Sequence, residues 1–103
     1  MRILFVLFAL AEGEKHGYAI MQDTVRLSGG SFRTGPATLY TTIQRLLEQG
    51  LIRETAGADG ADSRRRYYGI TPEGRSLVAM EVGRIESVVR RAAAMRLREA
   101  ESE

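Results

Sequence analysis

Hydrophobic residues near the amino terminus recur on more than one side of a predicted helix. The run Ile3–Ala11 is almost wholly apolar, so at about 100° per residue its side chains cover most of the helix circumference. We expect burial against its own domain and against a second surface, with Leu4 and Leu7 in the second contact. A short secretory signal has a similar pattern, but its removal would strip the core of so small a domain.

The second helix is predicted to span Gly17–Leu27, where apolar residues again recur at helical spacing. Ser28-Gly29-Gly30 ends it, because glycine accepts the backbone angles that follow a helix. We expect the next residues, Ser31–Arg33, to form a very short strand.

A third helix is predicted to begin at Gly35-Pro36, because proline suits the first helical position. Its core-facing residues are Leu39, Ile43, Leu46 and Leu47. The opposite face, centred on Thr41, is small and polar and lacks the alternating charges of an ordinary surface helix. Small residues let a helix enter a DNA major groove, where hydroxyl and amide groups read base edges. The expected groove-facing residues are Thr38, Thr41, Gln44 and Arg45.

Two short strands, Leu51–Thr55 and Arg64–Ile70, are predicted next, joined by a turn rich in glycine and aspartate. In the second strand Tyr68 and Ile70 share one face, which we expect to point inward, while Tyr67 points outward. Outward-facing basic and phenolic groups suit contact with phosphates or entry into the minor groove. The candidates of this kind are Arg64, Arg65, Arg66 and Tyr67.

The charge distribution agrees with a surface that contacts phosphates. The net charge of the 103-residue chain is only +2, but residues 31–75 contain seven arginines and five acidic residues, whereas the flanking segments are neutral. A localised basic segment is what a phosphate backbone selects, although the same arginines could form a solvated surface or pair with Asp59, Asp62 or Glu54. Exposed N–H groups at the start of the second helix can also meet a phosphate. The candidates there are Lys15 and Tyr18.

Thr71-Pro72-Glu73 predicts the start of a fourth helix, which is expected to continue to about Arg98. An apolar stripe runs along it. Its members are Val78, Val82, Ile85, Val88, Val89, Ala92 and Met95. No other long segment of the chain is left to cover this stripe, so the sequence predicts a dimer in which two such helices pack as an antiparallel pair or a small bundle.

The sequence offers little for catalysis or metal binding. It has no cysteine and one histidine, His16, which lacks the partners of a catalytic base and is expected to cap or pack a helix. A glycine loop that could cradle phosphates is also missing. We therefore expect no enzymatic activity, no cofactor and no metal. The absence of cysteine fits a cytoplasmic protein.

Four segments resemble PadR-type transcriptional regulators in order and spacing. They are Leu10–Ile20, Gly35–Tyr40, Arg45–Ile52 and Arg65–Gly74. The resemblance implies a mainly α, α+β fold: a winged helix-turn-helix with a two-stranded β-wing and a long C-terminal dimerisation helix. It also implies a homodimer, usually a repressor and often responsive to phenolic or drug-like ligands. Tyr40 would pack its ring and offer its hydroxyl to a phosphate.

We interpret residues 1–71 as a winged helix-turn-helix DNA-binding domain and residues 72–103 as the dimerisation helix. The expected function is sequence-specific regulation of transcription, by a repressor that binds a pseudo-palindromic double-stranded operator. A small hydrophobic or phenolic effector would release it by changing the angle between the two winged domains. The alternative is a winged-helix adaptor that binds proteins and has lost DNA binding.

Overall fold

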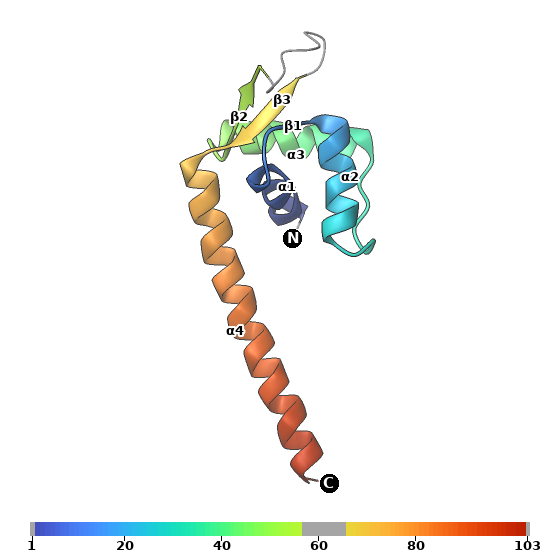
Figure 1. The fold of residues 1–103 in the computed structure, drawn as a ribbon, viewed down its shortest axis with the longest axis vertical. Helices are drawn as coiled ribbons and strands as arrows, with labels where there is room; N and C mark the ends of the chain where they lie inside the picture. The colour runs from blue at the N-terminus through green and yellow to red at the C-terminus, as the bar shows by residue number, and fades with distance from the viewer. Residues whose placement is uncertain (1, 57–65, 103) are drawn as a thin grey trace.

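Within the residues that the structure describes, 2–56 and 66–102, three short helices and a small sheet form the body of the molecule, and a long fourth helix leaves it (Figure 1). In this computed structural model the helices are α1 (Arg2–Ala11), α2 (Gly17–Leu27), α3 (Pro36–Glu48) and α4 (Pro72–Ser102). The molecule measures 62 × 26 × 23 Å along its principal axes. The long axis follows α4.

The ends of α2 and α3 follow from local signals that the sequence already contained. His16 caps α2, because its Nδ1 accepts a hydrogen bond from the Ala19 N–H at 3.3 Å. Pro36 occupies the first turn of α3. That helix ends before Gly50, whose φ of +72° is left-handed, and the Leu51 N–H then donates to the carbonyl of Leu46 at 3.0 Å.

The sheet has three antiparallel strands in the order β1-β3-β2. They are β1 (Lys15–His16), β2 (Ile52–Thr55) and β3 (Tyr67–Ile70). Tyr68 and Ile70 point inward as predicted, while Tyr67 is half-buried and meets the edge of the His16 ring, with centroids 5.5 Å apart. Arg64 and Arg65, expected to open the last strand, lie outside the described residues, and Arg66 precedes β3.

The expected strand at Ser31–Arg33 was wrong, because Lys15–His16 supplies the third strand instead. A hydrogen bond to a side chain and a contact between two rings hold residues 31–33 in place instead. The Phe32 N–H donates to Ser28 Oγ at 3.0 Å, and the Phe32 ring stacks on Phe5 with centroids 5.7 Å apart. The segment is therefore fixed to α2 and α1 and does not reach the sheet.

The core lies between α1, α2, α3 and the inner face of the sheet. Its buried members are Val6, Leu7, Ala9, Leu10, Ile20, Leu39, Ile43, Leu46, Ile52, Tyr68 and Ile70. α4 joins this core through its first turns only, where Leu77 and Val78 pack against the cluster. Thr71 caps the helix as expected, since its Oγ1 accepts from the Gly74 N–H at 3.1 Å and donates to the Gly50 carbonyl at 2.7 Å.

α4 extends beyond the residue at which we expected it to end. It continues to Ser102 rather than Arg98, and its described side chains from Val88 to Glu101 are all exposed. In Figure 1 the distal half of α4 projects away from the body without touching another element. In the described part of the chain, none of the helices combines the length and apolar character that crossing a membrane requires.

Candidate nucleic-acid interface

The outer face of α3 is small, polar and open to solvent, as the sequence predicted. Thr38, Thr41 and Arg45 are exposed and Gln44 is half-buried, because the opposite side is held in the core by Leu39, Ile43 and Leu46. Thr41 donates its hydroxyl to the Ala37 carbonyl within the helix at 3.1 Å. The threonine oxygen still has lone pairs with which it can accept a hydrogen bond from a base edge.

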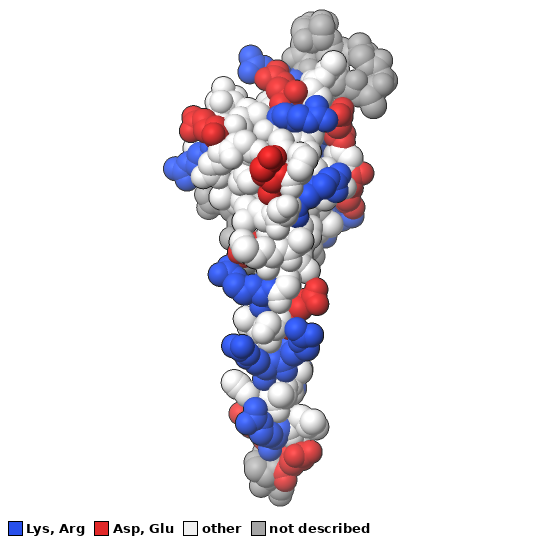
Figure 2. Space-filling model, turned by 90° about the vertical axis from the view of Figure 1, so that its left-hand side faces the viewer, with Lys and Arg blue, Asp and Glu red and all other residues white. Residues whose placement is uncertain are grey.

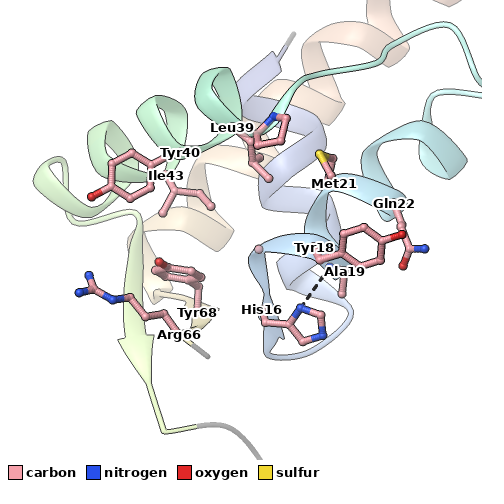
Figure 3. Close-up of a pocket in the computed structure, with 12 residues that line it drawn as sticks. His16, Tyr18, Ala19, Met21, Gln22, Leu39, Tyr40, Ile43, Arg66 and Tyr68 are labelled. Atoms are coloured by element: carbon pink, nitrogen blue, oxygen red, sulfur yellow. Dashed lines mark hydrogen bonds between the residues drawn. The ribbon is translucent and has the colours of Figure 1, made fainter. Parts of the chain in front are cut away.

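The beginning of α2 and the beginning of β3 lie beside α3 and enclose a hollow of about 680 Å³ (Figure 3). Tyr18 stands on one side of the hollow, and Tyr40 and Arg66 stand on the other. Both tyrosines are exposed, at 62% and 58%. Three of the residues predicted from separate motifs thus share one surface.

Arg66 lies directly before β3 and contributes a positive charge to the lining of the hollow. Its side chain is 65% exposed, and its Nε lies 4.0 Å from Glu54 Oε1. An exposed pair at this distance contributes little, so Arg66 is available to a phosphate. Glu54 is one of the three acidic residues that the sequence offered as alternative partners, and it lies beside Arg66. The other two, Asp59 and Asp62, lie outside the described residues.

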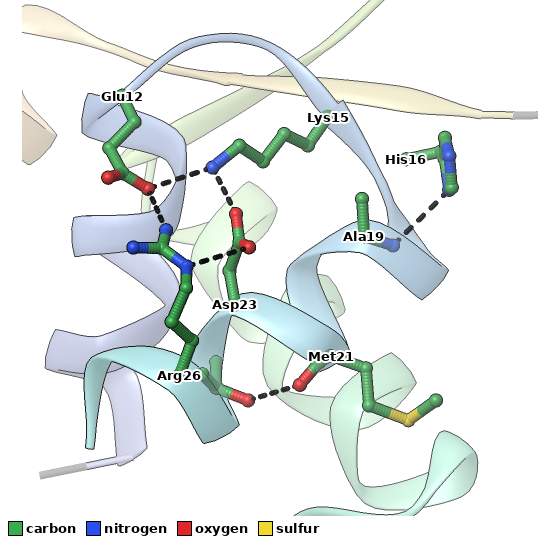
Figure 4. A network of polar contacts seen from close by, with 8 residues as sticks. Glu12, Lys15, His16, Ala19, Met21, Asp23 and Arg26 are labelled. Atoms are coloured by element: carbon green, nitrogen blue, oxygen red, sulfur yellow. Dashed lines mark hydrogen bonds and ion pairs between the residues drawn. The ribbon is translucent and has the colours of Figure 1, made fainter. Parts of the chain in front are cut away.

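Lys15 is in a different position from the one we expected for a phosphate contact. Figure 4 shows its ammonium between Glu12 and Asp23, with Arg26 on the same two carboxylates. Its side chain is only 19% exposed. Burial alone would lower the pKa of Lys15, but the hydrogen bonds to Asp23 and Glu12 outweigh that effect and raise it. A charge already matched by two carboxylates argues against Lys15 as a phosphate anchor.

The same cluster shifts the titration of its acidic member. The hydrogen bonds from Lys15 and then Arg26 lower the pKa of Glu12 below its ordinary value. The cluster ties the end of α1 to α2 and includes Lys15, the first residue of β1. We interpret it as a structural support for the hollow.

The dimerisation candidates fall into two groups. On α4, Val88 and Val89 are more than half exposed, as is Met95, and Ala92 is exposed as well. The more proximal Val78, Val82 and Ile85 are half-buried. In contrast, Leu7 is completely buried within its own chain and Leu4 is 6% exposed. The burial of Leu7 leaves its side chain no surface to offer a second copy.

The sequence did not predict that several further residues, most of them apolar, line the hollow. Met21 and Gln22 of α2 line it together with Leu39 and Ile43, which we had assigned to the core alone. A sequence signal existed for Met21, which follows Tyr18 at helical spacing, but only the packing of α2 against α3 leaves its side chain at a recess. The pKa of the Tyr68 phenol is raised by burial and by the charge of Glu54, so its hydroxyl stays neutral and can donate.

The described residues contain no group of histidine or carboxylate side chains that could hold a metal ion. What this surface brings together is a polar helix face, exposed phenols and a guanidinium. These groups donate hydrogen bonds to phosphates and stack on planar rings. Such chemistry fits binding rather than bond making.

The sequence matches the model of the transcriptional regulator PadR-like family over residues 6–80. It is 35% identical over 88 residues to a transcriptional regulator of Mycobacterium tuberculosis, covering 84% of this chain and 78% of that one. It is 38% identical over 78 residues to an uncharacterised transposon protein of Streptomyces fradiae. That match covers 76% of this chain but spans only about a fifth (21%) of the longer relative.

The fold is similar to that of Bacillus subtilis PadR, whose structure was solved in complex with operator DNA. The TM-score is 0.68 at 20% identity, over 80% of this chain and 46% of that one. At this identity the likeness establishes the fold: a winged helix-turn-helix with a small antiparallel sheet and a long C-terminal helix.

Proposed function

Because this chain belongs to the PadR-like family of transcriptional regulators, we propose that it binds an operator sequence-specifically and acts as a repressor. Family membership also makes it a regulator rather than an enzyme. The observation that carries the proposal is the exposed, small and polar face of α3, which lies beside the exposed Tyr18 and Arg66. That the Bacillus subtilis relative was solved on operator DNA supports it.

In this proposal α3 enters the major groove and reads base edges, while the flanking groups hold the backbone. The groove-reading residues are Thr38, Thr41, Gln44 and Arg45. The phosphate contacts are Tyr18, Tyr40, Arg64, Arg65, Arg66 and Tyr67. We leave Lys15 out of the set because Glu12 and Asp23 already neutralise its charge.

We further propose that residues 1–71 form the DNA-binding domain and residues 72–103 the dimerisation helix. The support is the row of exposed apolar side chains on α4, because a contiguous apolar face in contact with water is unfavourable and marks an interaction surface. Figure 2 shows basic side chains at intervals along α4, with uncharged and some acidic side chains among them. A second copy that packs against the exposed Val88, Val89 and Met95 would give the dimer two α3 helices, as binding to two half-sites about one DNA turn apart requires.

The regulator is proposed to work in the cytoplasm and to respond to a small hydrophobic or phenolic effector. An effector that changes the angle between the two winged domains would alter their fit to both half-sites at once. The second candidate function, a protein-binding adaptor, predicts that replacing Arg64, Arg65 and Arg66 with alanine leaves function unchanged. The regulator proposal predicts weaker binding to every DNA sequence.

The test is fluorescence anisotropy of a labelled duplex from the region upstream of the gene, compared with a scrambled duplex. We expect tighter binding to the native duplex. Thr41→Glu should abolish this preference, because it places a carboxylate at the centre of the face that meets DNA. Ser76→Glu introduces the same charge at an exposed site on α4 and is the matched control. Equal binding of wild type and Thr41→Glu to the native duplex would contradict the proposed role of α3.

A further inference from the structure

We infer that the hollow between α2, α3 and β3 is a binding site for a planar aromatic anion, and that such a ligand excludes DNA directly. The volume of about 680 Å³ is in the range of sites that hold small organic molecules. The residues that line this hollow come from the start of α2, from α3, and from Arg66 and Tyr68 at β3. The hollow therefore exists only when these three parts of the chain are packed together (Figure 3).

The lining fits a flat ring. Met21, Leu39 and Ile43 form an apolar wall between the aromatic side chains of Tyr18 and Tyr40. These two residues are 62% and 58% exposed. A planar ligand would cover apolar ring surface that now faces water, and aromatic pairs gain further from offset or edge contacts.

The charges around the recess select an anion. Arg66 gives the lining a permanent positive charge. The lining residues that the structure describes include no aspartate or glutamate. Among the described residues, the acidic group paired with Arg66 is Glu54, whose Oε1 lies 4.0 Å from Arg66 Nε. A carboxylate or sulfonate on the ligand could displace this long, exposed pair and form a charge-assisted hydrogen bond.

The position of the site determines what the ligand does. Tyr18, Tyr40 and Arg66 line the recess and are also proposed to contact the DNA backbone. Ligand and DNA therefore require the same side chains and cannot be bound together. This differs from an effector that acts through α4, which changes the domain angle from a separate site and leaves a ternary complex possible.

The binding test uses anilinonaphthalene sulfonate, an aromatic anion that carries a planar naphthalene ring and whose fluorescence rises in apolar surroundings. The dye is titrated into the full chain without DNA. Ala19→Phe should abolish the site by filling it, and Gln22→Glu should weaken binding by adding a carboxylate at an exposed lining position without changing size. Arg66→Ala should weaken binding about tenfold. Arg75→Ala, an exposed arginine outside the lining, should have no effect.

The competition test measures the apparent Kd for operator DNA at increasing dye concentration. Direct exclusion predicts a Kd that rises in proportion to the dye without a plateau. A plateau would show a ternary complex and overturn the inference. Dye binding that survives both Ala19→Phe and Gln22→Glu would overturn it too, because the dye would then occupy another surface, such as α4.

The inference rests on the proposed function only in the competition test, which requires that the chain binds operator DNA. If the chain binds no DNA but binds the dye with the expected variant pattern, the proposed function fails and the site remains. If it binds DNA and the dye has no site in the recess, the inference fails and the regulator remains. Circular dichroism of each variant confirms that the fold is kept.

Discussion

At the scale of single residues, Gly74 determines how closely α4 approaches the sheet. A side chain at this position would lie 2.7 Å from Ile70 Cγ1 and closer still to the carbonyl oxygen of Leu51. The missing Cβ therefore lets the first turn of α4 rest on the wing. The neighbouring cap, Thr71, adds two hydrogen bonds at the same junction.

We expect Gly74→Ala to lower the free energy of unfolding by about 1–3 kcal/mol, because backbone atoms of Leu51 would have to move. Urea unfolding measures it. Gly83→Ala, in the same helix, is the matched control. A Cβ added at Gly83 would meet no neighbouring side chain or other element within 4 Å, so the substitution should raise the free energy of unfolding by about 0.5–1 kcal/mol. Equal stabilities for the two variants would show that the contact at Gly74 relaxes at no cost.

Thr71→Ala should also destabilise the protein, by about 1–2 kcal/mol, because the Gly74 N–H and the Gly50 carbonyl lose their partner together. Thermal unfolding at neutral pH measures this loss. Thr41→Ala serves as the control, since its exposed hydroxyl bonds only to the Ala37 carbonyl of its own helix, and it should leave the melting temperature nearly unchanged.

At the scale of elements, the charge cluster of Glu12, Lys15, Asp23 and Arg26 joins α1 to α2. The lowered pKa of Glu12 means that its contribution is present above the ordinary glutamate value of 4.5 and is lost as pH falls through the lower, folded value. The raised pKa of Lys15 means that its contribution is present below 10.5 and is lost as pH rises through the higher, folded value.

We expect the free energy of unfolding to decline on acidification below the ordinary value of 4.5, and this decline to be shallower in Glu12→Gln. Urea unfolding across that range measures both slopes. Glu86→Gln, an exposed glutamate on α4, is the control and should leave the slope unchanged. A slope in Glu12→Gln identical to that of wild type would show that the cluster does not contribute to acid stability.

At the scale of the whole molecule, α4 explains the elongated shape and the proposed dimer together. Its 31 residues span about 46 Å at the usual helical rise, and only the first turns touch the body. The exposed apolar side chains further along have no cover within the described chain, so the monomer leaves Val88, Val89 and Met95 facing water.

Val89→Glu should convert a dimer into a monomer, because it would bury a carboxylate in the proposed helix pair. Ala94→Glu places the same residue on another side of α4 and should leave the dimer intact. Sedimentation velocity distinguishes the two masses. A wild-type chain that sediments as a monomer at micromolar concentration would contradict the proposed pairing.

Loss of the dimer should also weaken operator binding and reduce its salt dependence. If the dimer neutralises six or more phosphates, affinity falls by about a thousandfold between about 50 and 200 mM salt. Val89→Glu should have a smaller salt slope than wild type, because one domain makes fewer phosphate contacts. Anisotropy at several salt concentrations measures both slopes. Equal slopes would mean that a single domain makes all the contacts.

The sequence by itself determined the local features of this protein. Gly35-Pro36 and Gly50 predicted both ends of α3, and the spacing of Leu39, Ile43 and Leu46 predicted its buried face, because these signals act over one or two helical turns. The cap at His16 and the inward face of Tyr68 are of the same kind. Each depends on neighbours in the chain, so no tertiary information was needed.

Only the tertiary structure decided which distant residues meet. Lys15–His16 became the third strand in place of Ser31–Arg33, since strand pairing depends on which segment packing brings beside β3. Lys15 was drawn between Glu12 and Asp23, while Tyr18, Tyr40 and Arg66 came to surround one recess. These outcomes depend on how α2 is set against α1 and α3, an orientation that no local pattern contains.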